Sequence, residues 1–414
     1  MTAIVVALVL LLGAGSLLAQ APPSKADTAA VVNANSQFAF DLYRNLNADK
    51  ENKGKNIFVS PYSISTALAM TYVGSHGKTQ KQMAATLHFS LPMDKLESGF
   101  SGLLGETKAT PAKHYRLEVA NALWGQKNYH FDPNFTGAIS KYFDGGFNTV
   151  DFISPGAREE SRSKINQWVE DKTSGKIQDL IHREDISGDT RLILTNAIYF
   201  KGDWAAKFRK EQTKNEPFHI APSKTVPVPM MRQMGDFPFM ENGELQMIEL
   251  PYAEDELSMV IILPAGDVEA FGAGLTLAKL KELRGSLNRR EVEVYLPRFK
   301  FDTRYSLSNA LAAMGMPEAF EENVADFSGM TGKFELYISA VIHQAMIEVN
   351  EEGSEAAAAT AVIMTPGKSI RQEPPVFRAD RPFIFLILHK PTDSILFMGR
   401  LSSPQAAEGG TTGK

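Results

Sequence analysis

Hydrophobic positions follow helical and strand periods in turn along most of the chain. Residues 38–46 place them at helical spacing, and a strongly apolar helix opens at Ser60–Pro61, where Pro fits the first turn. A further helix is predicted at 165–175. Residues 191–204 are apolar almost throughout their centre, which predicts a strand buried on both faces in the middle of a sheet. Further strands are expected at 56–59, 257–264, 290–302, 340–350 and 383–390.

These elements alternate without an internal repeat or a Gly/Ser-rich linker, so we predict one mixed α+β domain over residues 35–404. A flexible polar connector is expected at 22–34 and a disordered tail at 405–414. Residues 3–21 are apolar but short for a membrane span, and they end in small residues, which predicts a signal peptide at 1–21 and a secreted protein. The alternative is an uncleaved N-terminal anchor. In both cases we expect the folded part to lie outside the cytoplasm.

Composition narrows the classes of function. Charged residues make up 22% of the chain and no block of Lys and Arg occurs, so nothing favours a nucleic-acid partner. The sequence contains no Cys, which excludes disulfides, thiol nucleophiles and Cys-based metal sites. No His pair has metal-ligand spacing, and no nucleophile elbow or phosphate-binding loop occurs. We therefore expect no enzyme activity, no metal and no cofactor.

His343 is the most informative histidine because it lies inside an apolar predicted strand. A titratable group there costs free energy unless it is hydrogen-bonded. We interpret His343 as a core histidine, with a catalytic base as the alternative. Asn196 lies in another predicted core strand and needs partners for the same reason. Ser60 and Ser63, at the start of an apolar helix, are candidates to supply them.

Residues 351–362, EEGSEAAAATAV, have an ambiguous pattern. Ala is the best helix former and Ser354 is a suitable helix cap, yet the run lies between a predicted strand and a loop rich in Pro and Gly. We interpret it as a segment with two structures.

Six segments, in order, resemble the serpins over about residues 38–404. They are NIFVSPYSISTALAM, TNAIYFKGDW, LPRF, ADFSGM, AVIHQAMIEVNEEGSEAAAATA and FRADRPFIFLILHKPTDSILFMGRLSSP. The resemblance implies one domain of three β-sheets and about nine helices, with an exposed reactive-centre loop at about 351–376. It also implies an irreversible suicide-substrate inhibitor of an extracellular serine protease, and possible action on cysteine proteases. The cleaved loop of such an inhibitor inserts into the main β-sheet and traps the acyl-enzyme, so the expected partner is a protease in covalent complex with a monomer.

The resemblance assigns the hinge of the loop to Glu351, Gly353, Ser354, Glu355, Ala356, Ala357, Ala358, Ala359 and Thr360. After cleavage, the side chains at 354, 356, 358 and 360 must face the core, and all four are small and uncharged. Gly353 is free to take backbone angles that a side chain would forbid.

Two further groups match family positions. In the family, a polar cluster lies beneath the main sheet at the place where strands part to admit the loop. The residues that resemble this cluster are Ser60, Ser63, Asn196 and His343. Trp204 resembles the tryptophan at the top of that sheet, and Arg298 with Glu351 resembles a charged pair there.

The scissile bond has several candidates. Family spacing indicates Gly367–Lys368, while Lys368–Ser369 suits trypsin-like proteases and Lys368 is our preferred position. Arg371–Gln372 and the region near Met364 stay open. The alternative function is a carrier or chaperone with the serpin fold that does not inhibit. A hydrolase has almost no support, since no triad motif accompanies His343.

Overall fold

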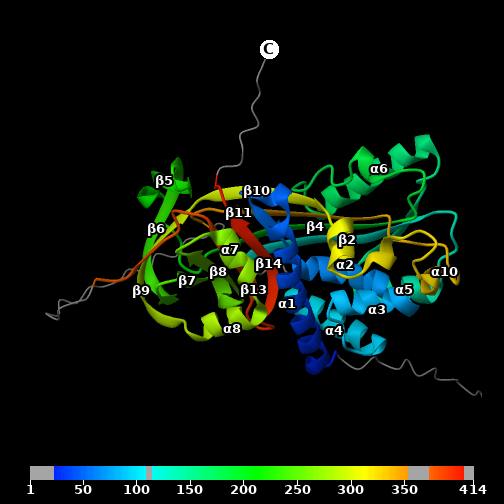
Figure 1. The fold of residues 1–414 in the computed structure, drawn as a ribbon, viewed down its shortest axis with the longest axis horizontal. Helices are drawn as coiled ribbons and strands as arrows, with labels where there is room; N and C mark the ends of the chain where they lie inside the picture. Colours follow the sequence, from blue (N-terminus) through cyan, green and yellow to red (C-terminus); the bar gives the residue numbers. More distant parts are fainter. Residues whose placement is uncertain (1–22, 109–113, 353–372, 405–414) are drawn as a thin grey trace, which may run out of the picture.

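Two hydrogen-bonded β-sheets organise the part of the chain that the computed structural model describes, residues 23–108, 114–352 and 373–404 (Figure 1). The five-stranded sheet has the order β10-β11-β4-β2-β3. Its strands are β2 (Tyr115–Gln126), β3 (Gly146–Val150), β4 (Leu192–Gly202), β10 (Phe299–Ser306) and β11 (Ala340–Val349).

The nine-stranded network has the order β1-β14-β13-β8-β7-β6-β9-β12, with β5 paired to β6. Its strands are β1 (Ile57–Val59), β5 (Lys214–Ala221), β6 (Lys224–Glu241), β7 (Leu245–Pro251), β8 (Leu257–Pro264), β9 (Asn288–Pro297), β12 (Val376–Arg378), β13 (Phe383–His389) and β14 (Ser394–Leu401). Only residues 239–241 of the long β6 join β7, while residues 230–239 pair with β9. The three expected sheets therefore occur as the separate five-stranded sheet and two further sheets that are joined through β6. One of these two contains β7 and the strands beyond it, and the other contains β9 and β12.

The α-helices of the described residues are α1 (Lys25–Ala48), α2 (Pro61–Val73), α3 (Gly77–Thr86), α4 (Met93–Thr107), α5 (Pro133–Tyr142), α6 (Pro155–Lys172), α7 (Val268–Gly274), α8 (Leu277–Gly285), α9 (Ser308–Met314) and α10 (Ser328–Thr331). Helix α2 is buried along almost its whole length, which agrees with apolar residues that occur on every side of it. Ser60 caps it, since its Oγ accepts a hydrogen bond from the N–H of Ser63 at 3.2 Å. The predicted start of this helix is confirmed.

The centre of the five-stranded sheet explains the long apolar run of the sequence. Strand β4 has β2 on one side and β11 on the other, and only Lys201 in it is more than marginally accessible. Helix α6 and the segment that follows it cover one face of this sheet, while α2 packs against the other face (Figure 1). The mixed α+β fold is thus the one expected.

Two expectations about segment limits are wrong. The flexible connector at 22–34 is mostly helix, because α1 already begins at Lys25. Two glycines of α4 leave room for the first turns of α1. A Cβ at Gly99 would lie 2.7 Å from the carbonyl oxygen of Asp27, and a Cβ at Gly102 would overlap Oγ1 of Thr28. The first turns of α1 therefore pack directly onto α4, which their few large apolar residues did not indicate.

The single strand expected at 290–302 is two strands in different sheets. The chain passes from β9 to β10 at Arg298, whose N–H donates to the carbonyl oxygen of Pro229 at 2.8 Å. Continuous apolar alternation hides such a change of partner, because each half satisfies its own sheet. The expected signal peptide and C-terminal tail lie outside the described residues. Within the described ranges, no helix combines the length and apolar character needed to cross a membrane.

Candidate functional site

The seam between β11 and β4 is the central feature of the five-stranded sheet. These strands are parallel neighbours, paired from Ala340↔Ile193 to Ile347↔Phe200. The chain leaves β11 after Val349, so the segment containing the predicted loop starts at one end of the seam. Within that segment, the hinge positions from Gly353 to Thr360 and the bond candidates Gly367, Lys368 and Ser369 lie outside the described residues.

A row of three polar side chains crosses the seam. His343 of β11 is paired with Asn196 of β4, which is paired with Asn121 of β2. His343 Nδ1 contacts the side-chain oxygen of Asn196, and the Asn196 amide donates to Asn121 Oδ1. His343 and Asn196 are completely buried. The strands are therefore linked through side chains as well as through their backbones.

The start of α2 completes this row from below the sheet. Ser60 N–H donates to Nε2 of His343 at 3.3 Å, and Nδ2 of Asn196 donates to Oγ of Ser63 at 2.6 Å. Ser63 Oγ in turn donates to Asn121 Oδ1 at 3.0 Å. The four residues expected to form a polar cluster, Ser60, Ser63, Asn196 and His343, are thus joined in one network of hydrogen bonds. Their role in opening the sheet stays a prediction.

The protonation state of His343 follows from these contacts. Its Nε2 accepts from Ser60, so the ring proton is on Nδ1 and is donated to Asn196. Burial lowers the pKa of His343 to about 3, while the hydrogen bond with Asn196 acts in the opposite direction. A neutral, completely buried and hydrogen-bonded ring is the core histidine that the sequence indicated, and it lies out of reach of any solvent-borne substrate.

Asn121 is the member of the cluster that the sequence analysis missed. It lies in β2 between Ala120 and Ala122, both completely buried. An amide between two small buried residues in a strand is the same signal that identified Asn196, and it was available in the sequence.

Residues that follow β4 cover the end of the seam at which β11 ends. The Trp204 ring stacks on Tyr252 with centroids 4.5 Å apart, and its Nε1 donates to the carbonyl oxygen of Asn350 at 2.9 Å. The N–H of Phe208 donates to the carbonyl oxygen of Glu351 at 3.1 Å. The backbone that leaves β11 is thereby tied to the β4 side of the seam.

Glu351 anchors the same place through its side chain. Its Oε1 accepts hydrogen bonds from Arg298 at 2.5 Å and from Thr213 at 2.6 Å, and the residue is only 2% exposed. Burial raises the pKa of this carboxyl, but the hydrogen bonds from Arg298 and Thr213 outweigh it, so the pKa lies below its usual range. The next residue, Glu352, forms an ion pair with Lys210. The expected pair of Arg298 and Glu351 is therefore present in the structure.

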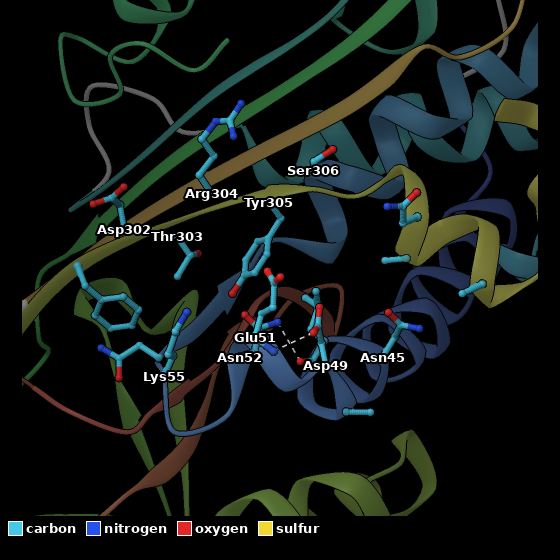
Figure 2. Close-up of a pocket in the computed structure, with 17 residues that line it drawn as sticks. Asn45, Asp49, Glu51, Asn52, Lys55, Asp302, Thr303, Arg304, Tyr305 and Ser306 are labelled. Atoms are coloured by element: carbon cyan, nitrogen blue, oxygen red, sulfur yellow. Dashed lines mark hydrogen bonds between the residues drawn. The ribbon is translucent and has the colours of Figure 1, made fainter. Parts of the chain in front are cut away.

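Strand β10, beyond β11, presents different side chains to its two faces. Thr303 and Tyr305 face a groove of about 1020 Å³ that lies between this strand and the end of α1, whereas Asp302 and Arg304 point to the opposite side (Figure 2). The groove opens at the free edge of the sheet and away from the seam. Arg304 is therefore directed toward the face that α6 covers.

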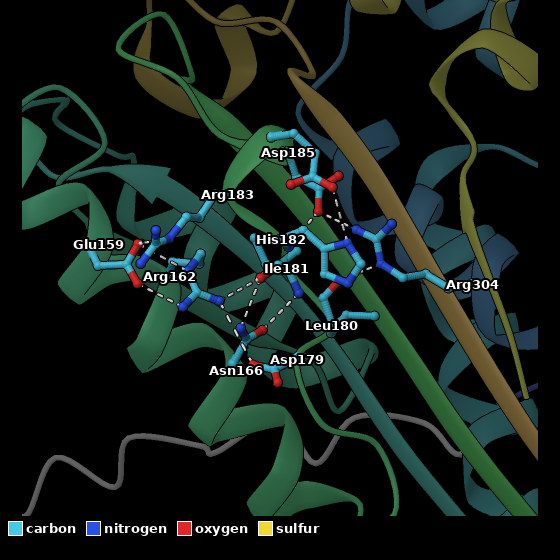
Figure 3. A network of polar contacts seen from close by, with 11 residues as sticks. Glu159, Arg162, Asn166, Asp179, Leu180, Ile181, His182, Arg183, Asp185 and Arg304 are labelled. Carbon is cyan, nitrogen blue, oxygen red and sulfur yellow. Dashed lines mark hydrogen bonds and ion pairs between the residues drawn. The ribbon is translucent and has the colours of Figure 1, made fainter. Parts of the chain in front are cut away.

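A segment that we call the strap, residues 177–186, crosses the seam on that face. Arg304 Nε donates to the carbonyl oxygen of Leu180 at 2.8 Å, and its guanidinium forms an ion pair with Asp185 (Figure 3). On the other side, Nδ2 of Asn166 in α6 donates to the carbonyl oxygen of Ile181 at 2.9 Å, and the N–H of Ile181 donates back to Oδ1 of Asn166 at 2.8 Å. The strap is therefore tied at both sides.

The strap also packs on both strands of the seam. Its apolar side chains share one buried cluster with residues of β4 and β11: Ile177, Leu180, Ile181, Ile186, Ile193, Ala197, Ala340 and Ile342. Because Arg304 belongs to β10 and the strap leads into β4, their contacts span the seam. Opening the seam at this end requires the strap to lift or to release Arg304.

Comparisons with known proteins agree on one family. The sequence model described as Serpin (serine protease inhibitor) matches residues 33–404. The leukocyte elastase inhibitor of Xenopus laevis is 42% identical over 377 residues, which cover 89% of this chain and 98% of that protein. The leukocyte elastase inhibitor of Sus scrofa is 44% identical over 382 residues, which cover 90% and 98%.

Solved structures give the same result for the fold. Uncleaved ovalbumin is 31% identical with a TM-score of 0.80, and the match covers 91% of this chain and 100% of that one. Human thyroxine-binding globulin is 31% identical with a TM-score of 0.81, and the match covers 92% and 100%. The matched range contains the seam, the polar row and the strap.

Proposed function

Because the chain belongs to the serpin family, we propose that it is an irreversible suicide-substrate inhibitor of a serine protease. Membership in this family supports protease inhibition rather than catalysis. In the proposed reaction, the protease serine oxygen attacks the carbonyl carbon of the scissile residue, and the following residue leaves as a free amine. The resulting ester links the protease to the N-terminal part of the loop, which then enters the seam between β11 and β4.

The parallel pairing of β11 and β4 is the observation that carries this proposal. A segment that turns back after Val349 runs antiparallel to β11, and it also runs antiparallel to β4 because those two strands are parallel. Insertion therefore replaces one parallel ladder by two antiparallel ladders, which are slightly more stable per residue. The additional strand pairing favours insertion of the loop, and it opposes the return of the acyl-enzyme to the uninserted state.

The sequence of the loop supports the same proposal. Its alternate positions Ser354, Ala356, Ala358 and Thr360 are small and uncharged, as burial beneath the sheet demands. We propose Lys368 as the bait residue and a monomer as the active form. Export from the cell is part of the proposal, supported by the apolar residues 3–21 with their small residues near Ala21.

The proposal is tested by mixing the protein with trypsin or pancreatic elastase and separating the products on a denaturing gel. A band that resists SDS and contains both chains is expected, together with a short C-terminal fragment. Sequencing the N-terminus of that fragment identifies the bond. Clean cleavage without a covalent band would contradict the inhibitory function.

The alternative is a carrier of small molecules or a chaperone. It is supported by the similarity to thyroxine-binding globulin, whose name states that it binds thyroxine. Cleavage without complex formation would favour this alternative.

A further inference from the structure

A buried carboxylate at the end of β4 has an incomplete set of partners. Asp203 follows β4 directly and is only 5% exposed, yet its Oδ1 has no hydrogen-bond partner among the described residues. Its Oδ2 lies 3.6 Å from Nδ1 of His114, which is too far for a hydrogen bond. A buried carboxylate costs free energy unless a donor or a positive charge compensates it. A cationic neighbour would therefore stabilise Asp203.

His114 is the side chain placed to supply that charge. It directly precedes β2, and its other ring nitrogen, Nε2, lies 3.8 Å from Oε1 of Glu254 in the turn between β7 and β8. The ring is 48% exposed, so it can exchange protons with the solvent. A neutral imidazole has one N–H, whereas a protonated one has an N–H on each nitrogen and a positive charge. Protonation therefore lets His114 attract Asp203 and Glu254 at the same time.

Other charged side chains occur on the elements that carry this cluster. Asp255 of the same turn is paired with Lys390, which lies between β13 and β14, at 2.6 Å. The remaining ones are Arg116 of β2, Lys201 of β4, Lys207 in the segment after β4, and Glu256. Among these types of side chain, only histidine ordinarily changes its charge between about pH 5 and 8. The charge of the cluster in that range thus depends on His114.

The cluster joins two parts of the molecule whose relative position changes when the seam opens. Strands β2 and β4 are paired along their common length, so they move as one unit. The N–H of Asp203 extends this ladder by donating to the carbonyl oxygen of His114 at 3.0 Å. The turn before β8 belongs to the other sheet, and its Ala253 N–H donates to the carbonyl oxygen of Asp203 at 2.6 Å. Displacing β4 from β11 therefore disturbs the contacts with this turn.

We propose that His114, Asp203 and Glu254 form a pH-sensitive latch at this end of the seam. In mildly acidic solution the charged ring attracts both carboxylates and holds β2 and β4 to the turn between β7 and β8, so that loop insertion slows. Because the carboxylates favour the charged ring, the stabilisation is present at low pH and is lost as the pH rises. The inference rests on the proposed insertion of the loop.

The test compares His114→Gln with the wild type at pH 5.5 and at pH 8, since glutamine cannot acquire the charge. The matched control is His219→Gln, which changes an exposed histidine of β5, a strand outside the five-stranded sheet. Incorporation of a synthetic peptide with the sequence of residues 354–365 is followed by native gel electrophoresis. Hydrogen exchange is measured at the amides of Asp203 and Ala253. Proteins are compared at the same pH, so the effect of pH on His343 is common to them.

At pH 5.5 we expect His114→Gln to incorporate the peptide about threefold faster than the wild type and to exchange both amides faster. At pH 8 it should match the wild type, and His219→Gln should match the wild type at both values. Asp203→Asn removes the buried charge, so His114→Gln should have no further effect in that background.

Equal incorporation by His114→Gln and the wild type at pH 5.5 would overturn the latch and leave loop insertion standing. An acceleration of the same size at pH 8, or in His219→Gln, would overturn it too. If no protein incorporates the peptide at either pH, loop insertion itself fails, and hydrogen exchange alone decides the latch. Equal exchange of the two amides in His114→Gln and the wild type at pH 5.5 would then overturn it.

Discussion

Asn196 on β4 and His343 on β11 face each other across the seam and are joined by a hydrogen bond between Oδ1 and Nδ1. A strand inserted at this seam would move these two residues from one strand spacing apart, about 4.8 Å, to two. The hydrogen bond must then break. Because the other members of the polar cluster, Asn121, Ser60 and Ser63, have amide and hydroxyl side chains, they offer replacement partners at the moment of opening.

Acidification is expected to weaken the native state through His343. Its pKa is about 3 in the folded protein against 6.5 in an exposed histidine, so the folded state favours the neutral ring. The stability from this group is complete above pH 6.5 and is lost as the pH falls toward 3. Between pH 7.5 and pH 5, we expect the free energy of unfolding to drop by roughly 2 kcal/mol from this group.

Urea unfolding at pH 7.5, 6 and 5 measures this dependence, and His343→Gln serves as the control because it cannot acquire the charge. The variant should lose less stability on acidification than the wild type. The same loss in both proteins would show that other groups are responsible.

Removing the tie between β10 and the strap should ease the opening of the seam. Arg304→Ala eliminates the contacts with Leu180 and Asp185, each a charge-assisted hydrogen bond worth roughly 1.5–3 kcal/mol. We expect the variant to incorporate a synthetic peptide with the sequence of residues 354–365 at least about fivefold faster than the wild type, as measured by native gel electrophoresis.

Arg289→Ala is the matched control for this change, since it removes an exposed ion pair with Asp236 that lies away from the seam. It should incorporate the peptide at the wild-type rate. If both variants behave alike, the strap does not restrain the seam.

Side-chain parity in the loop gives a third prediction. Ala356→Arg or Thr360→Arg should convert the protein from inhibitor to substrate, because insertion would bury an unpaired guanidinium at a cost of several kcal/mol. Ala357→Arg and Ala359→Arg, at the alternate positions, should remain inhibitors. The readout is the ratio of covalent complex to cleaved protein on a denaturing gel, and equal ratios for the two pairs would show that the parity is wrong.

Much of the fold was predictable because hydrophobic alternation marks buried strands directly. The limits of β8 agree with the expected 257–264, and β13 differs from the expected 383–390 by one residue. The local sequence pattern did not predict the limits of an element where tertiary contacts determine them. The first turns of α1 contain few large apolar residues and are held by close packing on the glycines of α4.

The candidate site also has a part that was predictable from the sequence and a part that was not. His343 and Asn196 were recognisable because a polar residue in an apolar strand must be satisfied by a partner. The strap was not predictable, because Arg304 and Asp185 are far apart in the sequence and each reads as an ordinary surface charge. Only the folded chain brings them together across the seam.

Loop insertion itself is the central claim, and calorimetry of the protein cleaved in the loop tests it most directly. Cutting the chain between residues 361 and 371 normally loosens a protein, but an inserted strand adds ladder hydrogen bonds worth roughly 1 kcal/mol each. We expect the thermal midpoint of the cleaved protein to lie roughly 10 °C or more above that of the intact protein. Gly353→Pro, which stiffens the hinge and removes a backbone donor, should reduce this gain. An unchanged or lower midpoint for the cleaved wild type would contradict insertion.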